Sequence, residues 1–417
     1  MRIAATGFVC EQAGSIATAN ALLLRALLKK GVEIDFFSKP SFVDPRPAVG
    51  SHDAFRFFST VNYLADRFRS TVERLPVLGF VAGRYDAFTY NKMLVHKMSA
   101  MHRERKYNLC LWFGTYARGR IPGIPHASFV QGPPGTDARS VIRMYTEIRN
   151  CAGNLLALRW KVMAFLRLSR LGLPPFHYTD HFIVGSSQSK KTLERLYGIL
   201  PQRVSAMPYP IDLELFHPPS EIRVSTPELR ILWLGRIIPR KRLDLFLDGA
   251  KLAIDGGLNI SVNIVGGIGF IHGYEKLIEA FPHAKRIKWN KFIPRRDVPG
   301  FMTEHDVLVQ PSDEEDFGSS VAEAQACGLP VIVGRTNGNA DYLSPKDIHL
   351  ADDHPETLAA ALAEMALRKK EGKLGDAAES RIAAEKNFET NRVVEQLIKI
   401  LTNVSHNHSH LPSASIS

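Results

Sequence analysis

Short apolar runs of strand length alternate with longer amphipathic stretches along most of the chain. Residues 15–31 carry apolar positions three and four apart and end at Gly31, which predicts a helix with a glycine stop. Each apolar run ends in small or polar residues, as strands do where they leave a sheet. In the first half these runs are residues 2–8, 32–37, 108–114, 127–132 and 181–187. Strands that alternate with helices predict a parallel, doubly wound α/β sheet.

The alternation is interrupted once, by a proline-rich segment, and then begins again. Residues 207–230 contain five prolines, which resist regular structure and suit an interdomain linker. We therefore predict two Rossmann-like domains, residues 1–208 and 229–390, joined by a linker at 209–228. Strand-like runs of the second half are residues 229–235, 260–267, 306–311 and 330–334. Because open α/β sheets bind ligands at the carboxyl ends of their strands, the site is expected in the cleft between the domains.

The end of the chain is predicted to leave the second domain. Residues 391–404 have a helical pattern and are expected to form a helix that could cross back to the first domain. Residues 405–417 are polar and are predicted to be disordered. The histidines of this tail could hold a metal weakly, but a frayed tail is the favoured interpretation.

Composition fits a globular protein of the cytoplasm. Apolar residues make up 45% of the 417 residues and charged residues 23%. The four cysteines lack CxxC spacing, which argues for reduced thiols and against a disulfide framework or a zinc knuckle. The sequence opens directly on an apparent strand, so no secretory signal peptide is expected. No uncharged apolar run is long enough to predict a spanning helix.

The positive charge is confined to the first half of the chain. Residues 1–215 contain 29 Lys and Arg against 15 Asp and Glu, whereas the whole chain has a net charge of +11. A one-sided surplus suggests a polyanionic partner, and a solvated basic surface is an equally good explanation. No helix-turn-helix, RNA-binding or zinc motif is present, so nucleic acid is not the expected partner.

One basic segment leaves two interpretations open. Residues 154–172 carry four Lys or Arg and no acid, interleaved with leucines, Trp160 and Phe165. This pattern suits an amphipathic helix on an anionic membrane. It also suits an ordinary core helix with solvated arginines.

The stretch WLGRIIPRKR, residues 233–242, places cations at a strand-to-helix junction. Gly235 allows a tight turn, Arg236 leaves the top of the sheet, and Lys241 lies five residues further on. A guanidinium fork, an ammonium and a helix N-terminus together suit a diphosphate. The alternative is a solvated basic turn, since Arg240 and Arg242 lie alongside.

The stretch EEDFGSSVAEAQACGLPVIVG, residues 314–334, holds Glu315 and Glu323 with seven residues between them. Ser320 and Glu323 have the spacing of a capping box, which predicts that Ser320 caps the following helix. Gly318 and Ser319 then present backbone amides at a helix N-terminus, where phosphate binds well.

Taken together, IVGG, PSDEEDFGSSVAEAQACGLPVIV and LGRIIPRKR resemble the donor-binding half of a GT-B glycosyltransferase, most like family four. The spacings G-R-x-x-x-x-K and E-x7-E of that family are both present. The resemblance covers residues 203 to about 390 and extends more weakly to 181–199. It implies retaining transfer of a sugar, of hexosyltransferase type, from a nucleotide sugar, with no metal and no other cofactor. On this basis residues 229–390 would bind the nucleotide sugar and residues 1–208 the acceptor.

The resemblance also implies a role for each matching residue. Arg236 and Lys241 would neutralise the diphosphate leaving group, and Glu323 would hold the ribose hydroxyls. Glu315 would orient the donor sugar. The donor-binding residues expected on this basis are Gly235, Arg236, Lys241, Asp316, Phe317, Gly318, Ser319, Ser320 and Glu323, with Arg236, Lys241 and Glu315 closest to the chemistry.

Several positions depart from the family pattern. Asp316 stands where relatives have glycine, and PYPID, residues 208–212, replaces the usual P-N-G-V-D of the linker. Gln131 stands where the family often has a histidine near the anomeric centre, and His126 lies at the other end of that strand. Gln131 can exchange hydrogen bonds with a sugar but cannot act as a base. Gly14 belongs to an amino-terminal loop that would meet phosphate and acceptor.

The sequence thus predicts a glycosyltransferase for a glycan or lipid-linked acceptor, in cell-surface polysaccharide synthesis. Its expected location is the cytoplasm, peripheral on the inner face of the cytoplasmic membrane. A nucleotide-sugar epimerase of the same architecture and a non-catalytic nucleotide-sugar-binding module are the alternatives.

Overall fold

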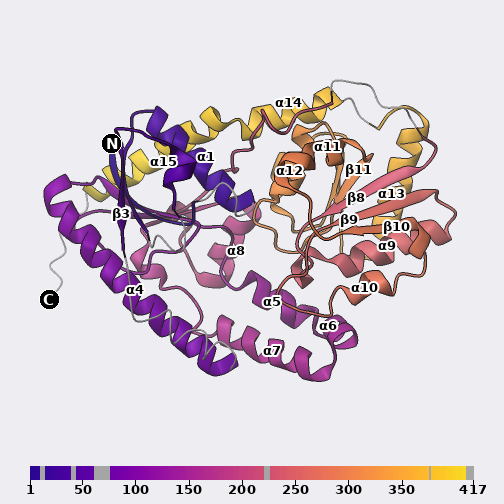
Figure 1. Ribbon diagram of the computed structural model, residues 1–417, viewed down its shortest axis with the longest axis horizontal. Coiled ribbons are helices and arrows are strands. Elements are labelled where there is room, and N and C mark those ends of the chain that lie inside the picture. The colour runs from indigo at the N-terminus through magenta and orange to yellow at the C-terminus, as the bar shows by residue number, and fades with distance from the viewer. Residues whose placement is uncertain (10–14, 39–43, 61–75, 220–225, 375–376, 410–417) are drawn as a thin grey trace.

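A computed structural model shows two parallel α/β domains side by side (Figure 1). It describes residues 1–9, 15–38, 44–60, 76–219, 226–374 and 377–409. Gly14 lies outside the described residues. The two doubly wound sheets that the sequence predicts are present, and every described strand pairing is parallel.

The first sheet has seven strands in the order β3-β2-β1-β4-β5-β6-β7. Strand β1 pairs with β2 through Ile3 and Ile34 and with β4 through Ile3 and Leu109. These side chains are fully or nearly fully buried, as expected for strands covered on both faces. The strands are β1 (Arg2–Gly7), β2 (Glu33–Ser38), β3 (Phe55–Ser59), β4 (Leu109–Phe113), β5 (His126–Phe129), β6 (His181–Val184) and β7 (Val204–Ala206).

Helix α8 of the first half begins and ends at capping residues that can be recognised in the sequence. Helix α8 begins where the Ser186 hydroxyl accepts from the amide of Ser189, and it ends at Gly198 in the left-handed conformation. The described helices are α1 (Ser15–Lys29), α2 (Arg46–Val49), α4 (Pro76–Arg105), α5 (Thr136–Arg143), α6 (Tyr145–Ala152), α7 (Asn154–Leu168) and α8 (Ser187–Tyr197), with short 3-10 helices η1 (Phe176–Tyr178) and η2 (Pro201–Arg203).

The second sheet has six strands in the order β10-β9-β8-β11-β12-β13. They are β8 (Leu229–Leu234), β9 (Ile260–Val265), β10 (Ile287–Asn290), β11 (Val307–Gln310), β12 (Val331–Val333) and β13 (Ile348–His349). The strand order reverses between β8 and β11, so the loops after these two strands meet at the switch point where ligands of such sheets bind.

Helices cover both faces of the second sheet. Helix α9 packs against α13 through a broad apolar face that includes Leu243, Phe246 and Leu358. The elements are η3 (Pro239–Lys241), α9 (Leu243–Asp255), α10 (Lys276–Glu279), η4 (Ala284–Arg286), η5 (Arg295–Asp297), α11 (Val298–Thr303), α12 (Ser319–Ala326), η6 (Gly338–Tyr342), α13 (Pro355–Lys370) and α14 (Ala377–Phe388).

The division into packing units differs from the division along the chain. The last strand of the first sheet ends at Ala206 and the second sheet begins at Leu229. However, α5, α6 and α7 precede the linker and still join the apolar core of the second sheet. Trp160 of α7 contacts Phe270, with ring centroids 5.1 Å apart. A boundary at residue 208 therefore does not separate the two cores.

The chain ends on the first domain. Helix α15 (Thr390–Ser409) packs on α1, and Lys30 forms a salt bridge of 2.6 Å with Glu395 (Figure 1). The predicted crossing helix is therefore present. The prediction that residues 405–417 are disordered is wrong for 405–409, because the helix continues to Ser409 and Ser405 donates to the carbonyl of Asn108. Residues 410–417 lie outside the described part of the chain.

Two further sequence expectations can be compared with the structure. Cys110, Cys151 and Cys327 are free thiols, and Cys10 lies outside the described residues. Across the parts of the chain that the structure describes, no helix is both long and apolar enough to cross a bilayer.

We expect Leu397→Ala to destabilise the protein strongly, because this fully buried leucine attaches α15 to the core of the first domain. Loss of its contacts should cost about 2–5 kcal/mol of unfolding free energy. Guanidinium unfolding should therefore show a clear fall in the midpoint. The exposed neighbour Lys399→Ala should change the unfolding free energy by no more than about 0.5 kcal/mol. Equal effects of the two substitutions would contradict this account of α15.

Candidate functional site

The loop after β8 places cations at the switch point. A Cβ atom on Gly235 would lie 3.6 Å from Cε of Lys241, so the two residues are neighbours in space. Arg236 is exposed and, among the described residues, makes no hydrogen bond or salt bridge. Lys241 ends η3 and is largely buried. The structure thus brings together Gly235, Arg236 and Lys241, as the sequence predicts.

Glu315 binds two cations of this loop, Lys241 and Arg240. Its Oε2 atom is 2.5 Å from Nζ of Lys241 and 2.8 Å from a guanidinium nitrogen of Arg240. Arg240 also contacts Asp137 of α5 at 2.9 Å. Burial alone would raise the pKa of Glu315, but the charges of Arg240 and Lys241 outweigh it and lower the pKa to about 2. Glu315 is therefore ionised throughout the physiological range.

Sequence reasoning treated Arg240 and Arg242 as neighbours in a basic turn, and the structure shows that neither is a solvated surface residue. Arg242 forms a salt bridge of 3.1 Å with Asp244, while Arg240 holds Glu315. Arg240 was missed because its partners lie 75 and 103 residues away in sequence. The cluster contains three cations, Arg236, Arg240 and Lys241, against two carboxylates, which leaves one positive charge.

Helix α12 begins earlier than the predicted capping box requires. Its N-cap is Gly318, which has a φ of 79° and no side-chain cap. Ser320 therefore lies in the first turn, where its hydroxyl accepts from Nε2 of Gln310 at 2.5 Å. The prediction that Ser320 caps the helix is wrong. Ser319 and Ser320 lie in the first turn of α12, where backbone amides have no partner within the helix. These amides follow the loop that carries Phe317.

Glu323 is buried one turn into α12. It accepts a hydrogen bond of 3.0 Å from Arg295 in η5, a partner that the sequence did not suggest. Burial raises the pKa of Glu323, and the nearby Arg295 opposes this shift. The structure therefore holds Glu323 in place through an ion pair and does not use it as a capping residue.

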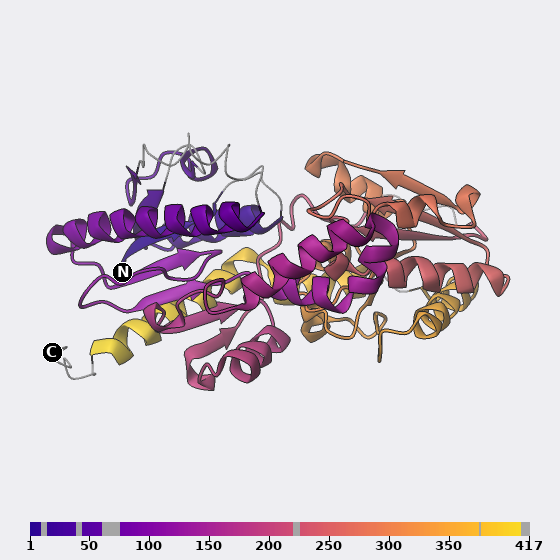
Figure 2. The ribbon, with the colours of Figure 1, turned by 90° about the horizontal axis from the view of Figure 1, so that it is seen from below.

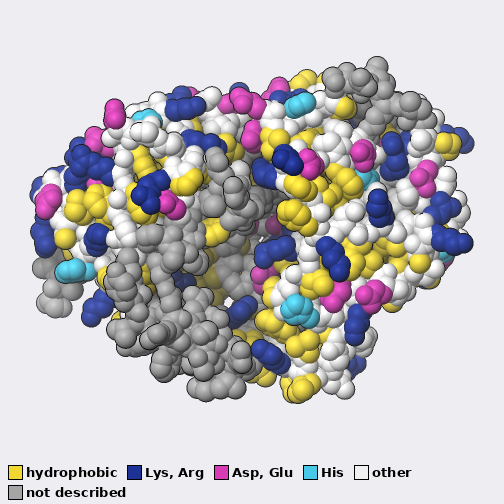
Figure 3. Space-filling model, in the orientation of Figure 1, with side chains coloured by type: hydrophobic (Ala, Val, Ile, Leu, Met, Phe, Trp, Pro, Cys, Tyr) yellow, Lys and Arg dark blue, Asp and Glu magenta, His cyan; other side chains and the backbone are white. Residues whose placement is uncertain are grey.

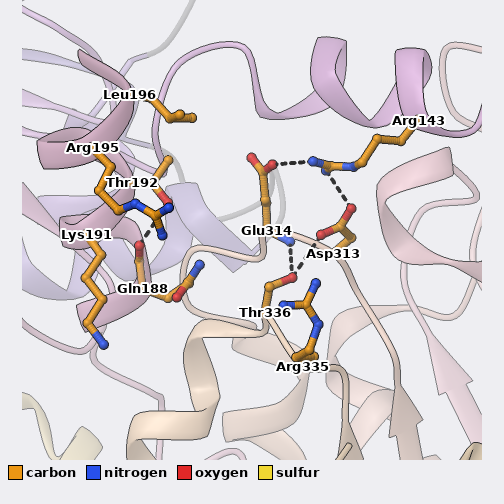
Figure 4. Close-up of a pocket in the computed structure, with 10 residues that line it drawn as sticks. All are labelled: Arg143, Gln188, Lys191, Thr192, Arg195, Leu196, Asp313, Glu314, Arg335 and Thr336. Atoms are coloured by element: carbon orange, nitrogen blue, oxygen red, sulfur yellow. Dashed lines mark hydrogen bonds and ion pairs between the residues drawn. The ribbon is translucent and has the colours of Figure 1, made fainter. Parts of the chain in front are cut away.

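Glu314 faces away from Glu315 and connects the donor-side loop to α5. Its carboxylate is bound by Arg139 and, at 2.7 Å, by Arg143, which also reaches Asp313 at 2.5 Å. Arg143, Asp313 and Glu314 form one wall of a pocket of about 280 Å³ between the domains. Figure 4 shows α8 on the opposite wall, with Lys191 and Arg195, and Arg335 below. None of these residues was predicted to be functional.

Asp316 follows Glu315 in the chain and lies at the contact between the domains. It accepts from the amide of Gly185, at 3.1 and 3.2 Å, and from the hydroxyl of Tyr209. A Cβ atom at residue 185 would lie 2.7 Å from its Oδ2, so glycine is required there. The side chain therefore binds the end of β6 and the linker, while the prediction placed it beside the donor.

Two departures from the family pattern thus contact each other. Tyr209 stands in the altered linker motif PYPID, and Asp316 stands where relatives have glycine. The Tyr209 ring also contacts Phe129 and Phe317, with centroids 5.2 and 4.8 Å apart. Burial raises the pKa of Asp316 to about 6, although its hydrogen bonds act in the opposite direction. Tyr209 and Asp316 together form one buried contact between the linker and the second domain.

Gln131 remains the candidate of the first domain. Its Nε2 atom is buried and has no hydrogen-bond partner among the residues that the structure describes, and its Oε1 atom would lie 2.9 Å from a Cβ atom on Gly114. An unpartnered buried amide is a donor that a ligand could satisfy. His126 is fully buried, and its ring nitrogens contact Trp112 and the amide of Ile121. These two contacts occupy both ring nitrogens of His126.

Within the described residues no group of three or more His, Cys, Asp or Glu is arranged to hold a metal ion. The sequence prediction of a metal-independent site stays a prediction.

The second half of the chain matches a known family. Residues 220–381 match the model described as glycosyl transferases group 1. A D-inositol 3-phosphate glycosyltransferase of Thermomonospora curvata is 28% identical over 180 residues, 38% of this chain and 42% of that protein. A GDP-mannose-dependent alpha-(1-6)-phosphatidylinositol dimannoside mannosyltransferase of Mycobacterium tuberculosis is 28% identical over 163 residues, 37% of this chain and 42% of that protein. The chain thus matches less than half the length of these relatives.

The fold is shared over nearly the whole chain. The crystal structure of Anabaena HepE in complex with UDP and glucose superposes with a TM-score of 0.61 at 14% identity. The superposition covers 96% of this chain and 99% of that one. These comparisons confirm the predicted resemblance to a GT-B glycosyltransferase of family-four type and the predicted GT-B fold.

Asp316→Asn should change how stability depends on pH. The pKa of Asp316 is raised from 3.8 to about 6 in the folded protein, so the folded state binds this proton more tightly. Its contribution is fully present below about pH 4 and is lost as pH rises through about 6, by up to about 3 kcal/mol. We expect the melting temperature of the wild type, relative to Asp316→Asn, to fall between about pH 4.5 and 7.5.

The matched control is Asp297→Asn, which removes an exposed carboxylate. Its melting temperature should follow that of the wild type at every pH. Parallel profiles for wild type and Asp316→Asn would mean that the buried carboxylate does not titrate in this range.

Proposed function

We propose that this chain, a GT-B fold whose residues 220–381 match glycosyl transferases group 1, is a retaining glycosyltransferase. It would move a sugar from a nucleotide-sugar donor to a glycan or lipid-linked acceptor, without a metal. The observation that carries the proposal is the convergence of Arg236, Lys241 and Glu315 with the start of α12, at the ends of β8 and β11.

The charge balance of this cluster suits a diphosphate. Three cations face two carboxylates, and the N-terminus of α12 adds its partial positive charge. Arg236 is exposed and unpaired among the described residues, so it can bind phosphate oxygens without breaking a contact. In the transition state these groups would stabilise the departing nucleoside diphosphate.

Glu315 and Glu323 would have separate tasks on the donor. Both cations contact Oε2 of Glu315, which leaves Oε1 to accept hydrogen bonds from sugar hydroxyls. Because its pKa is about 2, Glu315 would act as an acceptor and not as a proton shuttle. Glu323, which Arg295 holds in position, would accept from the ribose hydroxyls.

The proposed reaction does not require a base from the protein. The acceptor hydroxyl would attack the anomeric carbon on the face that the diphosphate leaves, and the bond from that carbon to the phosphate oxygen would break. The hydroxyl proton would pass to the departing phosphate oxygen. Gln131 would donate its free Nε2 hydrogen atoms to the sugar or acceptor.

The names of the relatives favour an acceptor that carries phosphate or lipid. One of them is named for inositol 3-phosphate and the other for a phosphatidylinositol dimannoside. We extend this to a lipid-linked or polymeric acceptor in cell-surface polysaccharide synthesis, at the inner face of the cytoplasmic membrane.

A nucleotide-sugar epimerase and a non-catalytic binding module remain the competing hypotheses. Incubation of the enzyme with each nucleotide sugar alone separates them. A rapid donor epimer would favour the epimerase, and donor binding without transfer or hydrolysis, across many acceptors, would favour the module. Thermal stabilisation by a panel of nucleotide sugars identifies the donor first, because binding to the folded state raises its melting temperature.

Lys241→Ala and Glu315→Gln should each lower sugar transfer from that donor by about 100-fold or more, because each removes a charged contact to the transition state. Steady-state kinetics measure this effect. The matched controls are Lys251→Ala and Glu364→Gln, which lie in exposed salt bridges on α9 and α13 and should leave transfer within about twofold. If both site variants turn over every accepted nucleotide sugar as the wild type does, the site is misassigned.

A further inference from the structure

Helix α7 exposes an apolar stripe to solvent. Leu155, Leu158, Val162 and Phe165 are between 45% and 84% exposed. Their spacing of three, four and three residues places all four on one face of the helix. Leu171 continues the exposed apolar surface just beyond the helix. Single exposed leucines need no explanation, but a contiguous stripe of this kind marks an interaction surface.

The stripe is held in place by the opposite face of the same helix. Ala157 and Ala164 are buried in the core of the second domain, and Trp160 contacts Phe270. The helix is therefore packed on the second domain along its length, and the stripe is exposed because it lies on the opposite side. Residues 154–168 therefore have one face in the core, and the face that bears the stripe lies outside it.

The surroundings of the stripe are basic. Residues 148–179 contain five Lys or Arg and no Asp or Glu. Arg159, Arg167 and Arg170 are exposed and form no salt bridge with any described residue. Lys161 lies on the other flank, 4.4 Å from the centroid of the Tyr145 ring. Figure 3 shows apolar side chains at the lower edge of the molecule, over α6 and α7, with Lys and Arg beside them.

We propose that the α7 stripe docks this protein on an anionic lipid bilayer. The helix would lie in the plane of the interface, with the stripe at the boundary of headgroups and acyl chains and the arginines on lipid phosphates. This inference names the partner for the membrane location proposed above and rests on that proposal. It adds the surface and the lipid charge that the docking requires.

Other features of the same side agree with this orientation. In Figure 2 the helices α4 and α7 both lie on the side that faces the viewer. Phe88 of α4 is also exposed, and α4 contacts α7. A second copy of the chain is a poorer occupant, because residues 148–179 carry Lys and Arg without Asp or Glu, and two such segments would repel each other.

The test is vesicle co-sedimentation of the full-length protein. Vesicles of phosphatidylcholine alone are compared with vesicles that also contain phosphatidylglycerol. We expect binding to the anionic vesicles only, with about a tenfold loss at high salt because exposed charges are screened. Two triple variants separate the contributions: Leu155→Ser with Leu158→Ser and Phe165→Ser, and Arg159→Gln with Arg167→Gln and Arg170→Gln. Each should weaken binding by about tenfold or more.

The matched control has the same number of apolar-to-serine changes on the second domain. Phe292→Ser, Leu367→Ser and Ile382→Ser replace exposed residues, and vesicle binding should stay within about twofold of the wild type. The proposal is overturned if the wild type ignores anionic vesicles, or if the α7 variants and the control bind alike. It is also overturned if α7 changes abolish a dimer in sedimentation velocity while leaving vesicle binding intact.

The docking test and the sugar-transfer test can fail separately. Thermal stabilisation by UDP or GDP should be the same in the wild type and both α7 variants, because the stripe contains no donor-site residue. Vesicle binding without any response to nucleotide sugars would refute the proposed function and leave the docking surface in place. The reverse result would refute only the docking surface.

Discussion

Three successive carboxylates, Glu314, Glu315 and Asp316, determine how the domains and the candidate site are arranged. Glu314 binds the arginines of α5, Glu315 binds Arg240 and Lys241, and Asp316 binds the end of β6 and Tyr209 of the linker. Each carboxylate is largely or wholly buried, so each needs its partner to offset the cost of desolvation. A short loop after β11 therefore fixes the first domain, the linker and the donor-side cations relative to one another.

This arrangement explains how one loop can be both rigid and ready for an anion. Asp316 holds the loop to the first sheet, and Glu314 holds it to α5 on the second domain. The middle carboxylate neutralises only part of the cation cluster. Arg236 stays exposed, and the first turn of α12 adds unpaired amides. A diphosphate would therefore meet groups already held near their binding positions, which lowers the cost of reorganisation. Tyr209 and Asp316, the two residues that depart from the family pattern, join the same loop to the linker through a hydrogen bond.

The sequence predicted the regular parts well because they depend on local patterns. Alternating apolar runs identified the strands that flank the site, and fixed spacings identified Gly235, Arg236, Lys241 and Glu315. Contacts between distant segments could not be predicted in this way: Arg240 with Asp137, Arg139 with Glu314, and Arg295 with Glu323 join elements 28 to 175 residues apart. The capping box failed because Gly318 adopts a left-handed conformation and starts α12 before Ser320. The packing of α5, α6 and α7 on the second domain could not be predicted either, because no local sequence pattern indicates it.

The central claim is that a nucleoside diphosphate binds where the loops after β8 and β11 meet. A crystal structure of the full chain with UDP or GDP tests this most directly. The account predicts phosphate oxygens within hydrogen-bond distance of Arg236, Lys241 and the first-turn amides of α12, with the ribose hydroxyls on Glu323. A diphosphate in the interdomain pocket beside Arg143 and Arg335, with Lys241 still bound to Glu315 and no contact at Arg236, would contradict it.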